Sequence, residues 1–419
     1  MLDIDVIKRW FDYLYSIGAD ETGGVTRLGY TKNEDVMHGA IRNFAREMGL
    51  KYSSDEVGNT YVYDEDYEEY YLIGSHLDSV ISGGRYDGVV GVLAGLLILK
   101  WIKDNNLNIP LKVVAFRCEE SSSFGIATVG SGLITKKLQI EKMKKVKNTE
   151  GVSLYEALRF RGYNPECRKI EGVLNYFELH IEQGRILEDE GLKIGIINSI
   201  AAATRYWLTI DGRQDHSGAT PMGMRQDALC AAGEIIIELE NIAKRESVHS
   251  SVGTVGYLGN YPNAFNVVPG RVKMGLDIRG VEKDSIDRID DEIVKFVDEV
   301  CKKRNLKYEL DNISKAIPVK LDENLKNELS EVATKLGVEH KIMNSGAGHD
   351  AMKFWDIAST GMVFIPCKDG VSHNKAEEIE YEDIILGSKI IFGELKQLNS
   401  RKIVEDKQKK DSLGGGESF

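Results

Sequence analysis

Histidines and acidic residues that can bind metal recur along this chain at points where an apolar run ends. His76 and Asp78 follow an apolar run that begins at Tyr71, and Asp87 follows a Gly-Gly turn at positions 83 and 84. A neutral imidazole binds a divalent ion, and a carboxylate binds the same ion, bridges two ions or orients the imidazole. The alternative is a polar pair that is satisfied at the edge of a sheet, and this stretch alone leaves both interpretations open.

Three later segments bring the same residue types to similar positions. Glu119 and Glu120 follow the run LKVVAF, His180 lies in YFELHIEQGRIL, and His373 lies in GVSHN. In an extended backbone neighbouring side chains point to opposite sides, so one glutamate can bind metal while the other faces the water beside it. Two divalent ions that share a carboxylate and a water need such a set of histidines and acids. We therefore predict a site for two metal ions.

Strands and helices in alternation must position these residues. The apolar runs that precede them predict buried strands, and the amphipathic or apolar runs between them predict helices. Ligands of open α/β sheets bind at the carboxyl ends of the strands, where these residues are expected. The predicted helices are 5–17, 35–48, 89–101, 153–160, 323–336 and 381–398; the predicted strands are 71–73, 111–116, the strand pattern within 176–187, and 362–365, with a hairpin over 51–63.

The pattern changes between residues 205 and 315. Strand, helix, strand, strand, helix and strand follow in that order, which is the ferredoxin-like signature of an inserted α+β domain. After residue 401 the chain is charged and ends in a glycine run, which predicts disorder. The predicted organisation is a catalytic domain over 1–204 and 316–400, an inserted domain over 205–315 and a disordered tail over 401–419.

Composition limits the partners of the protein. With 419 residues, 42% of them hydrophobic, the chain is long enough for two globular domains, and its net charge of −12 argues against nucleic acid or an anionic membrane. The five cysteines are scattered without a Cys-x-x-Cys spacing, which fits reduced thiols and predicts a cytoplasmic protein. The N-terminus carries acids early and lacks an apolar leader segment. Cys118, beside Glu119, is expected to be a buried thiol rather than a nucleophile.

The order of the motifs resembles a known family. GSHLDSV with GGRYDG, EE followed by Phe124, ELHIEQG, HSGATPM, NVVP with LDIR, SGAGHDA, and SHN with AE span residues 74–377. The chain is similar to the di-metal amidohydrolases of the aminoacylase/carboxypeptidase superfamily, and within them to the N-carbamoyl-L-amino-acid hydrolase and allantoate amidohydrolase branch. The resemblance implies a di-zinc-peptidase-like α/β catalytic domain with a mixed sheet flanked by helices. It also implies that the inserted ferredoxin-like domain serves as lid and dimerisation domain.

The same resemblance implies a role for individual residues. Glu119 would be the general base, and Asp78 would orient His76. His216 would reach into the partner's site and polarise the scissile carbonyl. Two divalent ions, zinc, manganese or cobalt, would be bound. The implied metal ligands are His76 and His180 for one ion, Glu120 and His373 for the other, and Asp87 between the two; the implied substrate-binding residues are Gln183, His216, Asn266 and Arg279.

The implied reaction is hydrolysis of the ureido bond of an N-carbamoyl-L-amino acid by a homodimer, which releases the amino acid, ammonia and carbon dioxide. Alternatives are an enzyme for allantoate or another ureido acid, a dipeptidase or aminoacylase, and a scaffold without activity. The complete set of ligands argues against the scaffold. Without the resemblance, Arg279 is a solvated strand-end charge and His216 a turn residue. Ser123 stands where the branch usually has arginine, which leaves the substrate open.

Overall fold

The computed structural model describes residues 2–414 and divides into two compact units. The first unit comprises the described residues within Met1–Asn198, Leu321–Met343 and Gly348–Phe419, and the second comprises Ser199–Lys320 with Asn344–Ala347. The second unit therefore extends beyond both ends of the segment 205–315 that the sequence marks as inserted.

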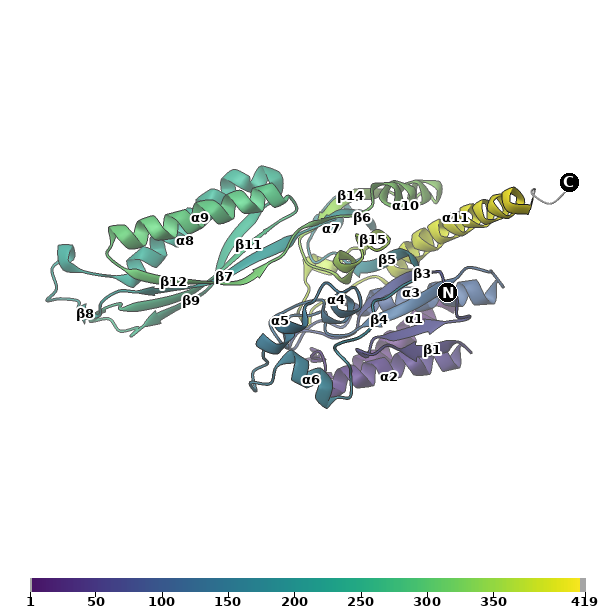
Figure 1. The fold of residues 1–419 in the computed structure, drawn as a ribbon, viewed down its shortest axis with the longest axis horizontal. Coiled ribbons are helices and arrows are strands. Elements are labelled where there is room, and N and C mark those ends of the chain that lie inside the picture. Colours follow the sequence, from purple (N-terminus) through teal and green to yellow (C-terminus); the bar gives the residue numbers. More distant parts are fainter. Residues whose placement is uncertain (1, 415–419) are drawn as a thin grey trace. The chain divides into compact units, whose positions relative to one another are not determined.

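A mixed β-sheet forms the centre of the first unit (Figure 1). Its strands are β1 (Lys51–Ser54), β2 (Thr60–Tyr63), β3 (Tyr70–His76), β4 (Leu111–Phe116), β5 (Val173–Ile181), β6 (Ile194–Ile200), β14 (His340–Ser345) and β15 (Ser359–Ile365). They lie in the order β1-β2-β4-β3-β5-β15-β6, and β14 pairs with β6. The neighbours β4, β3, β5 and β15 are parallel to one another, whereas β2 and β6 join this block antiparallel.

Helices cover one face of this sheet because its strands alternate their side chains with a period of two. Odd-numbered apolar residues of β3, β4, β5 and β15, such as Ile73, Val113 and Leu179, lie in one hydrophobic core with five helices. These helices are α1 (Leu2–Tyr15), α2 (Lys32–Glu47), α3 (Val89–Asp104), α10 (Glu323–Lys335) and α11 (Tyr381–Gly414). Every residue of α3 from Val89 to Leu99 is buried, as expected for a helix that is apolar all round.

Shorter helices complete the first unit. On the even-numbered face of the strands, Tyr176 of β5 stacks on Phe354 with ring centroids 4.3 Å apart. The remaining helices of this unit are α4 (Val129–Ile134), α5 (Ile140–Lys145), α6 (Leu154–Phe160), α7 (Ile186–Glu190), η3 (Asp350–Lys353) and η4 (Lys368–Gly370). Among residues 2–414, no helix is both long and apolar enough to cross a membrane.

The second unit has the predicted β-α-β-β-α-β order. Its main elements are β7 (Ala202–Asp211), α8 (Ala228–Glu246), β9 (Val252–Tyr261), β11 (Arg271–Gly280), α9 (Lys283–Lys303) and β12 (Lys307–Lys315). The antiparallel sheet has the order β12-β7-β11-β9, and α8 and α9 cover one of its faces (Figure 1). Even-numbered residues of β7 and β11 pack against these helices, which leaves their odd-numbered residues on the open face. The short elements are β8 (Asp215–His216), η1 (Met222–Met224), η2 (Ser247–His249), β10 (Val267–Val268) and β13 (Val319–Lys320).

The predicted disorder from residue 401 is wrong for most of that segment. Helix α11 continues to Gly414, whereas the sequence predicted that it ends near residue 398. Lysine, glutamate and glutamine favour a helix even without a core to pack on. Arg401 and Lys402 also form ion pairs with Glu394 and Glu69. The last part of the predicted tail, 415–419, lies outside the described residues.

Candidate active site with a shared carboxylate

Four parallel strands bring the predicted ligands to one edge of the central sheet. His76 is the last residue of β3, and His180 is the next-to-last residue of β5. Glu120 follows β4, and His373 lies in the loop after β15. Because β4, β3, β5 and β15 are parallel neighbours, their carboxyl ends meet at the same edge.

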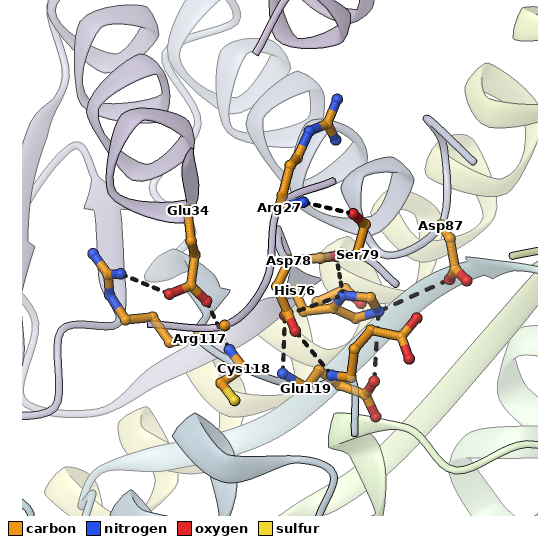
Figure 2. Close-up of polar contacts among 12 residues, drawn as sticks. Arg27, Glu34, His76, Asp78, Ser79, Asp87, Arg117, Cys118 and Glu119 are labelled. Atoms are coloured by element: carbon orange, nitrogen blue, oxygen red, sulfur yellow. Dashed lines mark hydrogen bonds and ion pairs between the residues drawn. The ribbon is translucent and has the colours of Figure 1, made fainter. Parts of the chain in front are cut away.

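Asp87 lies within 4 Å of the three histidines among these residues, and Figure 2 shows its contact with His76. Its Oδ1 is 3.0 Å from Nε2 of His180 and 3.9 Å from Nε2 of His76, while its Oδ2 is 3.1 Å from Nε2 of His373. A glycine is required beside it, because Gly88 has φ +68° and a Cβ there would lie 2.4 Å from the His76 ring. Asp87 therefore belongs to two groups of metal-ligating side chains, one with His76 and His180 and one with Glu120 and His373.

The hydrogen-bond partners of the two histidines show that the first group fits a metal ion. Nδ1 of His76 faces the Asp78 carbonyl at 3.1 Å, and Nδ1 of His180 faces the Ile181 carbonyl at 3.0 Å. A carbonyl only accepts hydrogen bonds, so both rings carry their proton on Nδ1 when neutral and direct an Nε2 lone pair towards Asp87. Asp87 Oδ1 is buried and receives no hydrogen bond from any described residue. Two lone pairs aimed at a carboxylate oxygen form a site for a cation.

The second group is more open to solvent. Nε2 of His373 lies 2.9 Å from Oε1 of Glu120, and hydrogen bonds to Asp87 and Glu120 raise the pKa of His373 to about 10. Gln183 donates from Nε2 to Oδ2 of Asp87 at 2.9 Å. Gln183, which the sequence assigned to the substrate, therefore contacts the shared carboxylate directly.

Glu119 lies beside the first group. Its side chain is buried, and its Oε2 is 3.8 Å from Nε2 of His76. Burial raises the pKa of the Glu119 carboxyl well above its usual range, although His76 opposes this shift. Strand β4 ends at Phe116, and the chain turns at Cys118, with φ +52°, before it reaches the two glutamates. The two glutamates nevertheless reach different histidines, Glu119 towards His76 and Glu120 towards His373.

Buried carboxylates hold the loops that carry these ligands. Asp78 accepts hydrogen bonds from the amides of Glu119 and Glu120 at 2.9 and 3.0 Å (Figure 2). Its carboxylate is 3.5 Å from Nδ1 of His76, so the predicted orienting contact is present but longer than the one from its own carbonyl. Asp78 therefore links the end of β3 to the segment after β4.

Glu377 holds the loop of Asp87 in the same way, although no role was predicted for Glu377 from the sequence. Its Oε1 accepts from the amides of Tyr86 and Asp87 at 2.6 and 3.0 Å. The Ser372 hydroxyl lies 3.1 Å from Oδ2 of Asp87 and 3.2 Å from Oε2 of Glu377. The AE motif, which contains Glu377, was the signal in the sequence that could have pointed to this residue. A motif does not show from which backbone amides a carboxylate accepts hydrogen bonds.

His349 and Glu178 are further residues that the sequence analysis left without a role. The ring of His349 is buried 4.5 Å from that of His180, and Glu178, His180 and His349 form a third group of metal-ligating side chains. Glu178 accepts from the Ser75 hydroxyl at 2.8 Å and the Ala351 amide at 2.9 Å. Its hydrogen bonds therefore fix β5 to its neighbours.

Three predicted substrate residues belong to the second unit. His216 is exposed, and its Nδ1 accepts from the amides of Gly218 and Ala219, so the neutral ring carries its proton on Nε2. Asn266 is exposed in the loop before β10. Arg279 donates to Asp277 on its own strand at 2.9 Å. The structure thus brings together the eight predicted residues of the first unit, namely His76, Asp78, Asp87, Glu119, Glu120, His180, Gln183 and His373.

Cys118 is buried, and burial raises the pKa of its thiol well above the usual range. A thiol that stays protonated is a poor nucleophile, in line with its expected structural role.

Residues 72–396 match the family model of Peptidase family M20/M25/M40. The chain belongs to this family. It is 36% identical to the N-carbamoyl-L-amino-acid amidohydrolase of a Pseudomonas species over 92% of this chain and 96% of the relative. It is 34% identical to the allantoate amidohydrolase of Bacillus subtilis over 91% of this chain and 94% of the relative. The crystal structure of a hydantoinase/carbamoylase family amidase from Burkholderia multivorans matches with a TM-score of 0.82 at 32% identity, covering 93% and 96% of the two chains.

These similarities confirm the predicted family and the α/β fold class. The predicted hydrolase is likewise confirmed, because the matched M20 relatives are amidohydrolases. The M20 family generally uses two metal ions, and this chain has clusters of side chains that could hold them.

Proposed function

We propose that this M20 enzyme hydrolyses the ureido C–N bond of N-carbamoyl-L-amino acids. The observation that carries the proposal is the Asp87 carboxylate, whose two oxygens face two separate groups of ligands with Glu119 alongside. The choice of a ureido acid is supported by the relatives named above.

The first unit supplies the groups that would hold two divalent ions. His76 and His180 would bind one ion, Glu120 and His373 the other, and Asp87 both. When bound, the ions would lower the pKa of a water between them and polarise the substrate carbonyl. Glu119 is assigned as the base because its buried carboxylate lies beside His76, next to the proposed metal ions, without being one of their ligands.

The proposed reaction requires one proton to be moved. Glu119 takes it from the attacking water, whose oxygen forms a bond to the ureido carbon. The protonated Glu119 then gives it to the departing nitrogen as the C–N bond breaks. For an N-carbamoyl-L-amino acid and one water, this step releases the amino acid and carbamic acid. Carbamic acid then breaks down to ammonia and carbon dioxide without a further water.

Residues of the second unit are assigned to the substrate. The Nε2–H of His216 is available to donate to the developing oxyanion, because its Nδ1 is already engaged by two amides. Arg279 would bind the substrate carboxylate, Asn266 would hydrogen-bond the substrate, and Gln183 of the first unit would contact the ureido group. Asp277 fixes the guanidinium plane of Arg279 from one side, which suits recognition of a planar carboxylate on the other.

A homodimer through the second unit is part of the proposal. β9 is an edge strand of its sheet and carries exposed apolar side chains, including Tyr257, Leu258 and Tyr261. The unpaired backbone groups of an exposed edge strand are a template for pairing with another chain. The proposed location is the cytoplasm, which suits a chain whose cysteines are all free.

A substrate panel with the metal-reconstituted enzyme tests the proposal. N-carbamoyl-L-amino acids, allantoate, N-acetyl amino acids and dipeptides are compared by kcat/KM, with ammonia release scored for the ureido compounds. The highest value is expected for an N-carbamoyl-L-amino acid. A higher value for allantoate would move the assignment to a different ureido acid.

The second candidate is a dipeptidase or aminoacylase, which is favoured by the peptidases that define the matched family. Cleavage of dipeptides or N-acetyl amino acids without ammonia release from any ureido acid would establish it. Inactivity towards the whole panel in a protein that holds two metal ions would favour a scaffold.

A further inference from the structure

Side chains hold the backbone amides of the segment that carries the two active-site glutamates, while the carbonyls of residues 117–119 accept from the backbone amides of residues 128–130. Strand β4 ends at Phe116, yet the next four backbone amides all donate to side-chain oxygens. Figure 2 shows the bonds to Glu34 and Asp78. In chain order from Arg117 to Glu120, the acceptors are Asn59 Oδ1 at 3.0 Å, Glu34 Oε1 at 2.8 Å, and the two Asp78 carboxylate oxygens at 2.9 and 3.0 Å.

Glu34 is fully buried and connects separate parts of the chain. It lies in the first turn of α2, with 0% of its surface exposed. Its Oε2 accepts from the Tyr30 amide at 2.7 Å and from Nη1 of Arg117 at 2.8 Å, while its Oε1 accepts from the Cys118 amide. Arg117 is itself 2% exposed and also donates to the Gly58 carbonyl at 2.6 Å. Three donors, one of them a buried guanidinium, thus engage one carboxylate.

The residue that Glu34 holds has an unfavourable backbone conformation. Cys118 has φ +52°, in the left-handed region that residues with a side chain rarely adopt. It is packed against Gly29, where a Cβ would come within 2.4–2.8 Å of three Cys118 atoms. The chain changes direction at this turn, which lies between the end of β4 and the two active-site glutamates. Surrounding contacts must maintain the turn. Two hydrogen bonds are made at Cys118 itself: its amide donates to Glu34, and its carbonyl accepts from the Val129 amide at 2.9 Å. Glu34 supplies the side-chain contact of the two.

We infer that Glu34, paired with Arg117, is a positioning residue that holds the left-handed turn at Cys118 and thereby directs Glu119 and Glu120 to different histidines. The inference rests on the proposed function for the roles of those two glutamates. Glu34 lies outside residues 72–396, where the family model matches. It acts through the Cys118 amide and not through the reacting atoms.

Glu34→Gln tests the inference in the metal-loaded full-length enzyme. The amide keeps the size of the side chain but turns one acceptor into a donor that faces the Arg117 and Tyr30 donors. We expect faster hydrogen–deuterium exchange in the peptide that covers residues 117–120 and a lower content of the metal held by Glu120 and His373. Misdirected catalytic groups should lower kcat by roughly 10- to 100-fold with little change in KM.

Glu394→Gln is the matched control. Glu394 of α11 is also fully buried and pairs with an arginine, Arg401, at 3.0 Å. It should lose thermal stability but retain kcat, metal content and the exchange rate of residues 117–120. A general loss of stability would affect both variants alike. Adding Cys118→Gly to Glu34→Gln should recover part of kcat, because glycine adopts positive φ without strain.

Wild-type exchange is a second measurement that needs no variant. The Cys118 amide should exchange far more slowly than the amides of residues 121–123. Fast exchange at Cys118 in the wild type, or a Glu34→Gln enzyme with normal kcat, metal content and local exchange, would overturn the inference. Absence of ureido hydrolysis together with a localised exchange change would instead reject the proposed function and leave the positioning role intact.

Discussion

The metal-ligating residues and the proposed substrate residues are held in different ways. In the first unit the ligand loops are fixed by buried carboxylates that come from distant parts of the chain, such as Glu377 at the Asp87 loop, 290 positions away. In the second unit, His216 and Arg279 are oriented by neighbours two or three positions away on an accessible surface. The contrast suggests that metal binding is preorganised, whereas substrate contacts tolerate change. Substitution of a metal ligand in the first unit should therefore abolish activity, and substitution of Arg279 in the second should reduce it by degrees.

Loss of metal should have the largest effect. Chelation is expected to abolish activity, and manganese, cobalt or zinc should restore it. His76→Ala, Asp87→Ala and His373→Ala should each lower the metal content measured by elemental analysis and leave no detectable turnover, because each removes a ligand of one or both ions. Arg279→Ala, in the second unit, should retain both ions. Full activity in metal-free protein would contradict the shared-carboxylate site.

Glu119→Gln should have the next largest effect. The amide keeps the shape of the side chain but cannot accept the proton, so kcat should fall roughly 10²–10⁴-fold, the usual contribution of general acid–base catalysis. Both ions should remain bound, which metal analysis of the same sample will show. Glu120→Gln is the matched comparison and should lose metal. The reverse pattern would mean that the two glutamates have exchanged roles.

Mixed dimers test whether His216 acts across subunits. His216→Ala and Glu119→Gln chains are each expected to be nearly inactive alone. If His216 serves the partner's site, a heterodimer regains one intact site, which is about half of the wild-type sites. Activity of purified, differently tagged heterodimers is the measurement. Heterodimers as inactive as their parents would show that His216 does not act in trans.

Arg279→Lys should have the smallest effect of the four. Lysine keeps the charge but loses the planar fork, so kcat/KM for carboxylate substrates should fall roughly 10- to 100-fold, the value of one or two charge-assisted hydrogen bonds. A substrate whose carboxylate is capped as an amide should lose much less. Equal losses for both substrates would show that Arg279 is structural and would reduce the contrast between the units.

The sequence predicted the parts of this molecule that are encoded locally. Strand β4 occupies the predicted run at 111–116, and the order of elements in the second unit is as predicted. The five proposed ligands converge because each follows a strand whose apolar pattern is clear, and parallel neighbours place such residues at one edge.

What the sequence did not predict depends on contacts between distant residues. Glu34 appears as an acidic residue in the first turn of a helix, which is usually solvated. Only the fold shows that it meets the amide of Cys118, 84 positions later. The turn at Cys118 was missed for a related reason, since no glycine marks it. The helical continuation of α11 was missed because a charged segment without a core was expected to stay disordered.

The burial of Cys118 gives the protein a chemical reporter of its own. Of the five free cysteines, Cys230 in α8 is exposed, and the other four are buried. A thiol reagent should therefore label Cys230 rapidly and reach Cys118 only when the segment beside Glu34 opens. Because Cys118 is adjacent to Glu119, its labelling rate measures how often the catalytic segment leaves its place. Substrate or metal that holds the segment closed should slow this reaction while Cys230 reacts unchanged.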